Sequence, residues 1–312
     1  MLIIKHTENF RIETPTIVTI GTFDGVHLGH QKILERLKEL KNKTGLKTVI
    51  LTFEPHPRKV LFPEQKDLKL ITTIDEKLQL LDQYGIDVTV VYPFSNYFST
   101  MDSDFYIQNI LLKQLNLKHL VIGYDHKFGK DRSGDINTLK QISVNGSFFI
   151  EEISAKDIDN IAVSSSKIRK CLQEGQIEIA NKNLGHHFFL NGKVIKGKQI
   201  GRSIGYATAN LKIEAEEKII PKIGVYFVKA RINSKLHFGM MNIGKNPTID
   251  IDKETKIEVH LFEFNEDIYD QTIQIIFISR LRDEKKFENL EELKAQLVND
   301  KKMCLELMHS PL

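Results

Sequence analysis

The sequence has little of what marks an exported or membrane protein. Its 312 residues include two cysteines, Cys171 and Cys304, and two thiols at this separation match neither a disulfide framework nor a metal-site spacing. No apolar run approaches the roughly 20 residues of a membrane span, and the first residues lack the basic and apolar pattern of a secretory signal. We therefore expect a protein of the reducing cytoplasm with no membrane partner.

An excess of charge of one sign is also lacking, because 44 basic residues are balanced by 41 acidic ones and the formal net charge is +3. Such a balance gives no electrostatic field that selects nucleic acid, so we expect no nucleic-acid partner. Hydrophobic residues make up 41% of the chain, an ordinary globular share. The length is comfortable for two domains, and the pattern leaves the oligomeric state open.

The first half alternates short apolar segments with segments of helical periodicity. The predicted strands lie at about 16–20, 46–53, 87–92, 118–122 and 147–153, and the predicted helices at about 30–42, 75–84, 103–115 and 136–143. This alternation indicates a parallel sheet covered by helices, in which ligands bind beyond the carboxyl ends of the strands. Two short helices, at about 165–174 and 176–184, close the half, and we place the domain boundary near 184–187.

The second half has a different pattern. Alternating segments such as 224–232 and 257–264, and the β-rich segment 272–278, are separated by Gly, Asn, Pro and Asp. They predict an antiparallel barrel or sandwich. We expect Gly239–Thr248 to be a loop, because it contains several turn-forming residues, and an amphipathic helix at about 287–308 to end the chain.

A glycine-rich segment follows the first predicted strand and opens the first predicted helix. It reads GTFDGVHLGH, from Gly21 to His30, with His27 and His30 three residues apart. Backbone N–H groups and the dipole at a helix N-terminus favour an anion. Imidazoles can add charge-assisted hydrogen bonds to phosphate oxygens, and Gly29 lets phosphates approach the backbone. Two surface histidines that cap a helix would explain the segment equally well.

Two further segments have residues suited to a phosphate site but are weaker signals alone. Residues 163–169 read VSSSKIR, in which serine is a good helix N-cap and Lys167 and Arg169 add donors for a triphosphate. By itself an ordinary capped helix with solvated basic residues explains this segment better. The loop Pro55–Arg58 follows a buried strand, and its two prolines alone account for a fixed loop.

Taken together, four blocks resemble a known family: GTFDGVHLGH, TFEPHPR at 52–58, VIGYDHKFGKDRSG at 121–134, and VSSSKIR. In this order they resemble the adenylyltransferase module of bacterial bifunctional riboflavin kinase/FAD synthetases, which are HxGH nucleotidyltransferases with a Rossmann-like α/β sheet. The resemblance implies that His27 and His30 are catalytic, since they would bind the ATP phosphates and stabilise charge at the α-phosphate. It also implies nucleotide contacts at Gly21, Phe23, Asp24, Gly29, Ser164, Ser165 and Arg169, and flavin contacts at Asp125 and Arg58.

The second half contains a basic, glycine-rich stretch at 192–211, GKVIKGKQIGRSIGYATANL. Backbone N–H groups of such a loop can wrap phosphates, but the spacing fits neither Walker A nor GxGxxG, and a basic hairpin is the simpler explanation of the glycines alone. Thr208 and Asn210 lie on one side of an extended segment, and their neutral oxygens suit Mg²⁺. In IEVHLFEF, at 257–264, Glu258 lies on the polar side, where a carboxylate is most often solvated but can also act as the base for a primary alcohol.

These blocks, with Arg282–Phe287, resemble the riboflavin kinase module of the same family, a small six-stranded barrel. The resemblance implies that Thr208 and Asn210 bind Mg-ATP, and that Glu258 activates the ribityl 5′-hydroxyl. Ala207 replaces the proline of the family tetrad Pro-Thr-Ala-Asn. The implied phosphate-loop contacts are Gly197, Lys198, Gly201, Arg202 and Gly205, and the implied flavin contacts are Asn242, Arg282 and Glu284.

The sequence therefore predicts a bifunctional transferase that uses ATP and Mg²⁺ in both steps. Residues 186–312, an antiparallel barrel with a C-terminal helix, would phosphorylate riboflavin to FMN. Residues 1–185, the α/β domain, would adenylylate FMN to FAD with release of pyrophosphate. Two alternatives stay open: a chain active in one step only, the kinase step being the weaker because of Ala207, and a non-catalytic flavin or nucleotide sensor.

Overall fold

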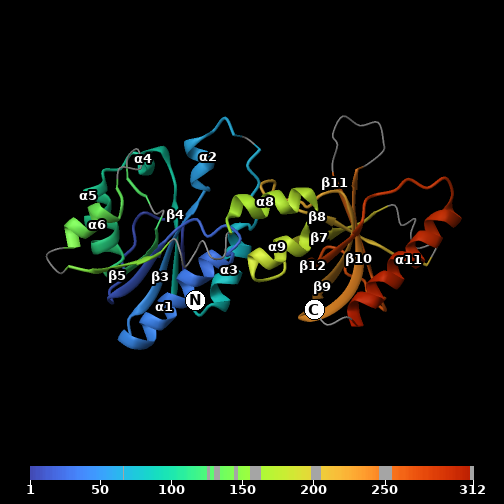
Figure 1. The fold of residues 1–312 in the computed structure, drawn as a ribbon, viewed down its shortest axis with the longest axis horizontal. Coiled ribbons are helices and arrows are strands. Elements are labelled where there is room, and N and C mark those ends of the chain that lie inside the picture. Colours follow the sequence, from blue (N-terminus) through green and yellow to red (C-terminus); the bar gives the residue numbers. More distant parts are fainter. Residues whose placement is uncertain are drawn as a thin grey trace. The chain divides into compact units, whose positions relative to one another are not determined.

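The computed structural model describes residues 1–65, 67–124, 127–129, 134–143, 147–154, 163–197, 205–245 and 255–309. The chain divides into two compact units, Met1–Ser165 and Ser166–Leu312, which Figure 1 draws in blue to green and in yellow-green to red. None of the described helices is long and apolar enough to cross a membrane.

Six strands form the sheet of the first unit. They are hydrogen-bonded in the order β1-β4-β3-β2-β5-β6, and the pairs are parallel, so the parallel sheet expected from strand–helix alternation is confirmed. The edge strand β1 was not indicated by the sequence pattern. The bounds are β1 Leu2–Lys5, β2 Thr16–Ile20, β3 Lys47–Glu54, β4 Val88–Pro93, β5 Leu117–Gly123 and β6 Phe149–Ile153.

The helices of this unit begin and end where local chemistry predicts. Helix α3 starts at a capping box, in which Thr73 and Glu76 each accept a hydrogen bond from the other's backbone N–H. Helix α1 ends at Gly45, whose φ of 72° suits glycine. The bounds are α1 Leu28–Thr44, α2 Pro57–Leu61, α3 Ile74–Gln83, α4 Asn96–Ser99, α5 Ser103–Phe105, the π-helical η1 Tyr106–Gln114, and α6 Ile136–Ser143.

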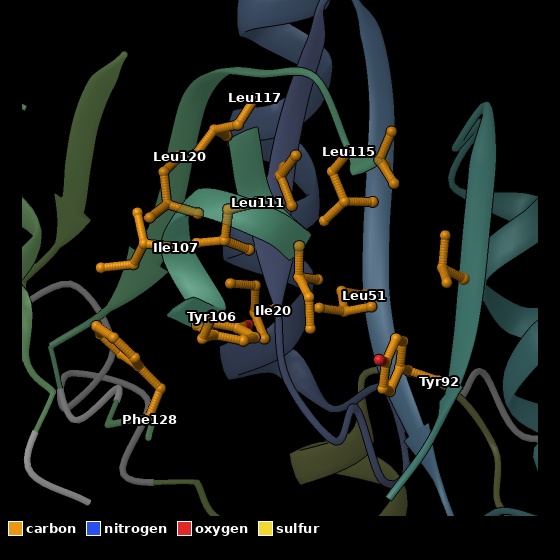
Figure 2. Packing of buried hydrophobic residues seen from close by; sticks show 14 of the residues in the cluster. Ile20, Leu51, Tyr92, Tyr106, Ile107, Leu111, Leu115, Leu117, Leu120 and Phe128 are labelled. Atoms are coloured by element: carbon orange, nitrogen blue, oxygen red, sulfur yellow. The ribbon is translucent and has the colours of Figure 1, made fainter. Parts of the chain in front are cut away.

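Helices cover both faces of this sheet. Strand β2 is buried along its whole length, as expected of a central parallel strand. On one face, Ile20 of β2 and Leu120 of β5 pack with Ile107 and Leu111 of η1 in one hydrophobic cluster, part of which is drawn in Figure 2. On the other face, α1 packs on β2, β3 and β5 and buries Leu37 completely. The strand ends are thereby held in fixed positions relative to α1.

The second unit is built on a closed antiparallel barrel with the strand order β10-β11-β8-β7-β12-β9. Of the two architectures expected from the sequence, the barrel is therefore the correct one. Strand β9 has the bounds predicted for it. The bounds are β7 Phe189–Ile195, β8 Ala209–Lys212, β9 Gly224–Ile232, β10 Lys235–Lys245, β11 Thr255–Leu261 and β12 Thr272–Arg282.

Strand β10 corrects one expectation, because Gly239–Lys245 is a strand and not a loop. Its glycines serve close packing: a Cβ on Gly239 would lie 2.5 Å from the carbonyl oxygen of His260 on the neighbouring strand. Residues 246–248 of the expected loop lie outside the described residues.

Three helices accompany the barrel: α8 Ser165–Glu174, α9 Ile177–Leu184 and α11 Leu290–His309. From Ser166 onward α8 belongs to the second unit, as does α9, whereas we expected both helices to close the first half. Asn181 of α9 shows the reason, because its side chain donates to the Phe277 carbonyl at 3.0 Å and accepts from the Phe188 N–H at 2.7 Å. The functional boundary near 184–187 stays a prediction.

Candidate functional site

Three of the sequence blocks of the first unit lie at the same edge of its sheet. Strands β3, β2 and β5 are neighbours, and because they are parallel their carboxyl ends lie side by side. The segment from Gly21 follows β2, the turn at His56 follows β3, and Tyr124 follows β5. The topology thus brings together blocks that are far apart in the sequence, at the edge where ligands of such sheets bind.

The segment between β2 and α1 has an unusual backbone held by buried contacts. Phe23 and Val26 have φ angles of 48° and 41°, which non-glycine residues rarely adopt. Asp24 is 1% exposed, and its carboxylate accepts the N–H groups of Ile71 at 2.9 Å and Thr72 at 3.0 Å. The carboxylate of Asp24, for which we predicted a nucleotide contact, therefore fixes the course of this segment.

Ser165 and Asp24 belong to different blocks and are in contact. The Ser165 hydroxyl donates to the Asp24 carbonyl at 3.0 Å, which ties the VSSSKIR block to the segment that leads into α1. Ser164 is exposed beside it. Arg169 is 9% exposed in α8.

His27 and His30 form a stacked pair at the start of α1. His27 is the N-cap residue, and the two ring centroids lie 3.7 Å apart with 15° between the planes. Nδ1 of His30 is buried without a hydrogen-bond partner among the described residues. Burial lowers the pKa of His30 well below its ordinary value, and the charges of His27 and Lys77 lower it further. His30 is thus neutral at pH 7, and one of its ring nitrogens carries a hydrogen that can be donated.

Glycine and phenylalanine shape the space around this pair. Gly29 is buried in the first turn of α1. The ring of Phe23 lies 4.9 Å from that of His30, and a Cβ on Gly21 would come within 3.1 Å of the Phe23 ring. Phe23 therefore packs against His30.

Lys77 of α3 is a charged residue of this region that the sequence did not single out. Its side chain is 6% exposed, and its ammonium donates to the Thr52 hydroxyl at 3.4 Å. Burial lowers the pKa of Lys77 to about 8, and the carboxylates of Asp24 and Glu54 partly offset that effect. A lysine on an amphipathic helix is normally expected to be solvated, so the sequence pattern did not indicate that Lys77 is buried.

Arg58, predicted to contact flavin, is exposed on α2, where its guanidinium donates to Gln65 Oε1 at 3.0 Å. His56 caps the same helix by accepting the Arg58 N–H at Nδ1. Asp125, the other predicted flavin contact of this unit, lies outside the described residues.

The second unit has a cavity of about 340 Å³, within the range of small-molecule sites. Its wall combines barrel strands, the segment after β12 and α11. Five of the predicted site residues line it: Thr208, Asn242, Glu258, Arg282 and Glu284. Helix α11 adds Leu293, Leu297 and Asp300.

Three of the predicted polar residues form one row across the barrel surface. Asn242 of β10 is paired with Glu258 of β11, and Glu258 is paired with Asn210 of β8. Paired residues on neighbouring strands point to the same side of a sheet, and Ile257 and Val259 are buried on the other side. The prediction that Glu258 lies opposite the apolar residues of its strand is confirmed. The Glu258 carboxylate also forms an ion pair with the Lys256 ammonium, with an N–O distance of 2.8 Å.

Thr208 and Asn210, which were predicted to bind Mg²⁺, have neutral side-chain oxygens. A Cβ on Gly197 would lie 2.0 Å from the Asn210 amide, so only glycine leaves room for that side chain at this point. The described residues contain no cluster of three or more His, Cys, Asp or Glu side chains suited to a metal ion. A magnesium ion would therefore take neutral protein oxygens here, with phosphate oxygens and water as its other ligands.

His260 holds the backbone just before Thr208. Its Nδ1 donates to the Ala207 carbonyl at 2.8 Å, and its ring lies 5.0 Å from that of Tyr206. The hydrogen bond fixes the tautomer with the proton on Nδ1. In this chain a side-chain hydrogen bond restrains the position where the family pattern has proline.

Arg282 and Glu284 are fixed by contacts that the sequence did not reveal. The Arg282 guanidinium donates to the fully buried Asp300 carboxylate from Nε at 2.9 Å and from Nη2 at 2.7 Å. A Cβ on Gly244 would lie 2.2 Å from Glu284 Oε1 and 3.1 Å from the Asn242 amide, so Glu284 lies directly over β10. The sequence did not indicate Asp300, since apolar residues are expected on the inner face of an amphipathic helix.

The loop contacts expected in the glycine-rich stretch lie mostly outside the described part of the chain, since Lys198, Gly201 and Arg202 are not in it. Gly205 is, with a φ of 82° that suits glycine.

Comparison with known proteins extends the likeness over both units. A family model for FAD synthetase matches residues 9–167, and one for riboflavin kinase matches residues 184–308. Proteins described as bifunctional riboflavin kinase/FMN adenylyltransferase include one from Buchnera aphidicola, 39% identical over 305 residues that cover 96% of each chain. Another, from Bacillus subtilis, is 36% identical over 297 residues, which cover 94% of this chain and 92% of the relative.

One solved structure is similar along nearly the whole chain. A crystal structure from Streptococcus pneumoniae, titled a macrolide-efflux protein, has a TM-score of 0.88 and 29% identity, and the match covers 97% of this chain and 99% of that one. The fold likeness and the sequence likeness thus extend over the same two units. The chain belongs to the family of bifunctional riboflavin kinase/FMN adenylyltransferases.

Proposed function

We propose that this chain makes FAD from riboflavin in two ATP-dependent steps, one in each unit. The observation that carries the proposal is that each family model falls on a unit with its own candidate site. The first unit has the stacked His27–His30 pair at a helix N-terminus. The second has Glu258 on the wall of a cavity of about 340 Å³.

In the kinase step, the 5′-hydroxyl oxygen of riboflavin attacks the γ-phosphorus of ATP. A new P–O bond forms, the bond to the β-phosphate oxygen breaks, and ADP leaves. Glu258 is placed to accept the hydroxyl proton, and the nearby Lys256 ammonium orients its carboxylate. Thr208 and Asn210 would hold Mg²⁺, which when bound neutralises phosphate charge.

The flavin itself suits the cavity of the second unit. Met240, Phe287 and Leu293 offer apolar surface for a ring system, while Asn242 and Glu284 offer polar contacts at the same wall. Sites for small molecules combine a mainly apolar lining with a few placed polar groups in this way. Arg282 contributes from a fixed position, because Asp300 holds its guanidinium.

In the adenylyl transfer, a phosphate oxygen of FMN attacks the α-phosphorus of ATP. The new P–O–P bond forms as the α–β phosphoanhydride breaks, and pyrophosphate leaves. No protein nucleophile is needed, because positioning and charge neutralisation account for such transfers. His27 and His30 are placed to donate to phosphate oxygens next to the N–H groups that begin α1.

Both steps are assigned to this one chain even though Ala207 replaces a proline. The alternative of a chain that lacks kinase activity rests on a loosened segment before Thr208. The His260–Ala207 hydrogen bond of 2.8 Å supplies a restraint at that position and favours a working kinase. We also infer a cytoplasmic location, in keeping with the free thiols of Cys171 and Cys304.

Purified protein decides between a bifunctional enzyme and a sensor. Incubation with riboflavin, ATP and MgCl₂ should yield ADP, FMN, pyrophosphate and FAD. The products are separated by chromatography, and the flavins among them are detected by their fluorescence. Incubation with FMN in place of riboflavin should yield FAD and pyrophosphate without ADP. A protein that binds flavin or nucleotide but releases neither ADP nor pyrophosphate would be a sensor.

A further inference from the structure

Lys77 of α3 is a buried cation without an adequate partner. Its side chain is 6% exposed, and in the described part of the chain its one hydrogen bond goes to the neutral hydroxyl of Thr52 at the long distance of 3.4 Å. An ammonium group has three donors, and burying a charge without good partners opposes folding. The residue is therefore costly in the protein without ligand.

The nearby carboxylates do not complete its coordination. The Asp24 carboxylate accepts the backbone N–H groups of Ile71 and Thr72, and Glu54 lies 3.2 Å from His6 Nε2. Among the described residues neither carboxylate is within 4.0 Å of the Lys77 ammonium, although both act on it through space and partly offset the lowering of its pKa to about 8 by burial. At pH 7 the ammonium is mostly charged.

The position of Lys77 connects it to the His27–His30 region. The Thr52 hydroxyl, which accepts the hydrogen bond from the ammonium, itself donates to the Thr22 carbonyl at 3.3 Å. Thr22 belongs to the segment that leads into α1. The charge of Lys77 is also close enough to His30 to help lower the pKa of that histidine. The cation thus lies at the carboxyl edge of the sheet, beside the groups proposed to bind phosphate.

We propose that the Lys77 ammonium is a phosphate-binding group of the adenylyltransferase site, whose partner is an anionic phosphate oxygen of ATP or of FMN. This inference rests on the proposed adenylyl transfer. A phosphate oxygen would supply the charge-assisted hydrogen bond that the free protein lacks, which accounts for a buried lysine that folding alone disfavours.

The test is Lys77→Met, which keeps an unbranched side chain, one atom shorter, and removes its charge. We expect kcat/KM for FAD formation to fall about ten- to a hundredfold, the scale of a lost hydrogen bond to a charged group. Riboflavin phosphorylation should be unchanged and the unfolding temperature equal or higher, since a poorly partnered charge has been removed. Lys41→Met is the matched control, because it removes a cation of the same unit that is paired with Asp87 at the start of β4.

The kinetic constants identify which phosphate Lys77 binds. A raised KM for ATP alone assigns the ammonium to the triphosphate, a raised KM for FMN alone assigns it to the flavin phosphate, and a lowered kcat alone assigns it to charge that develops during transfer. Wild-type constants for FAD formation in Lys77→Met would overturn the proposal for Lys77 only. Failure of the wild-type protein to form FAD would instead refute the adenylyltransferase function on which it rests.

A pH profile of the wild-type protein keeps the proposal testable if Lys77→Met does not fold. The titratable groups that face Lys77 are Asp24, Glu54 and His30, and His30 titrates far below this range. Since kcat/KM reports the free enzyme, it should fall as pH rises through about 8. Lys77→Arg, which stays charged, should remove that fall. A flat wild-type profile between pH 7 and pH 10 would contradict the inference.

Discussion

Replacing Asp300 by asparagine should destabilise the second unit measurably. The Asp300 carboxylate is fully buried and accepts two hydrogen bonds from Arg282 and one from Gln296, at 2.7–2.9 Å. Removing one partner of a buried ion pair costs about 3–5 kcal/mol. The Arg282 side chain is 21% exposed and can regain some water, so we expect a loss of about 2–3 kcal/mol.

In a unit of this size, that loss corresponds to a decrease of about 6–9 °C in the unfolding temperature. Circular dichroism on the full chain should show the decrease in one of two transitions if the units unfold separately. Kinase activity should fall with it, because Arg282 lines the cavity, while FAD formation from supplied FMN should persist.

The control removes both partners. Arg282→Met combined with Asp300→Leu leaves no buried charge unpaired and should be less destabilising than Asp300→Asn alone. An unfolding temperature of Asp300→Asn within about 2 °C of wild type would refute the reasoning, since the pair would then contribute little.

The remaining predictions concern the proposed reacting groups, the His260 hydrogen bond and the buried histidines. Glu258→Gln should lower the rate of FMN formation about 10²- to 10⁴-fold and leave FAD formation from FMN intact. His30→Ala should lower the rate of FAD formation about 10²-fold or more and leave the kinase step intact. The opposite pattern would show that the two activities have been assigned to the wrong units. His260→Asn places an amide donor where Nδ1 donates to Ala207 and should retain more kinase activity than His260→Gln, so equal losses would mean that this bond has no role. Burial lowers the pKa of His30, His187 and His260 below 6.5. The unfolded chain therefore binds protons that the folded chain does not, and the free energy of unfolding should fall as pH drops below about 6.5. Urea titrations at pH 7.5 and 5.5 that give equal free energies would contradict this.

Elements with a clear period could be predicted well from the sequence. Strand β9 and helices α6 and α8 have the bounds expected from their patterns, and the motif blocks of the first unit follow the strands that were predicted for them. These features depend on local periodicity and on residues that end helices or strands, both of which the sequence displays directly.

Contacts between residues far apart in the sequence were harder to predict from the sequence. The glycines of β10 suggested a turn, but Gly244 is small because Glu284 lies against it. The inner face of α11 includes Asp300 and Cys304, whereas an apolar pattern alone would have selected Leu290, which is 54% exposed. Lys77 was missed for the same reason, since nothing in its own helix indicates that the neighbouring strands bury it.

The place where the chain divides has consequences for how such enzymes are joined and separated in evolution. The VSSSKIR block starts in the first unit, where Ser165 bonds to Asp24, and continues into α8, which is grouped with the barrel. A gene break at this point would cut through the VSSSKIR block. A break after Gly185 would strip the barrel of α9, whose Asn181 bonds to the Phe277 carbonyl of β12 and to the Phe188 N–H. Neither position gives two intact products, so recombination between relatives should preserve this segment together with the barrel that follows it.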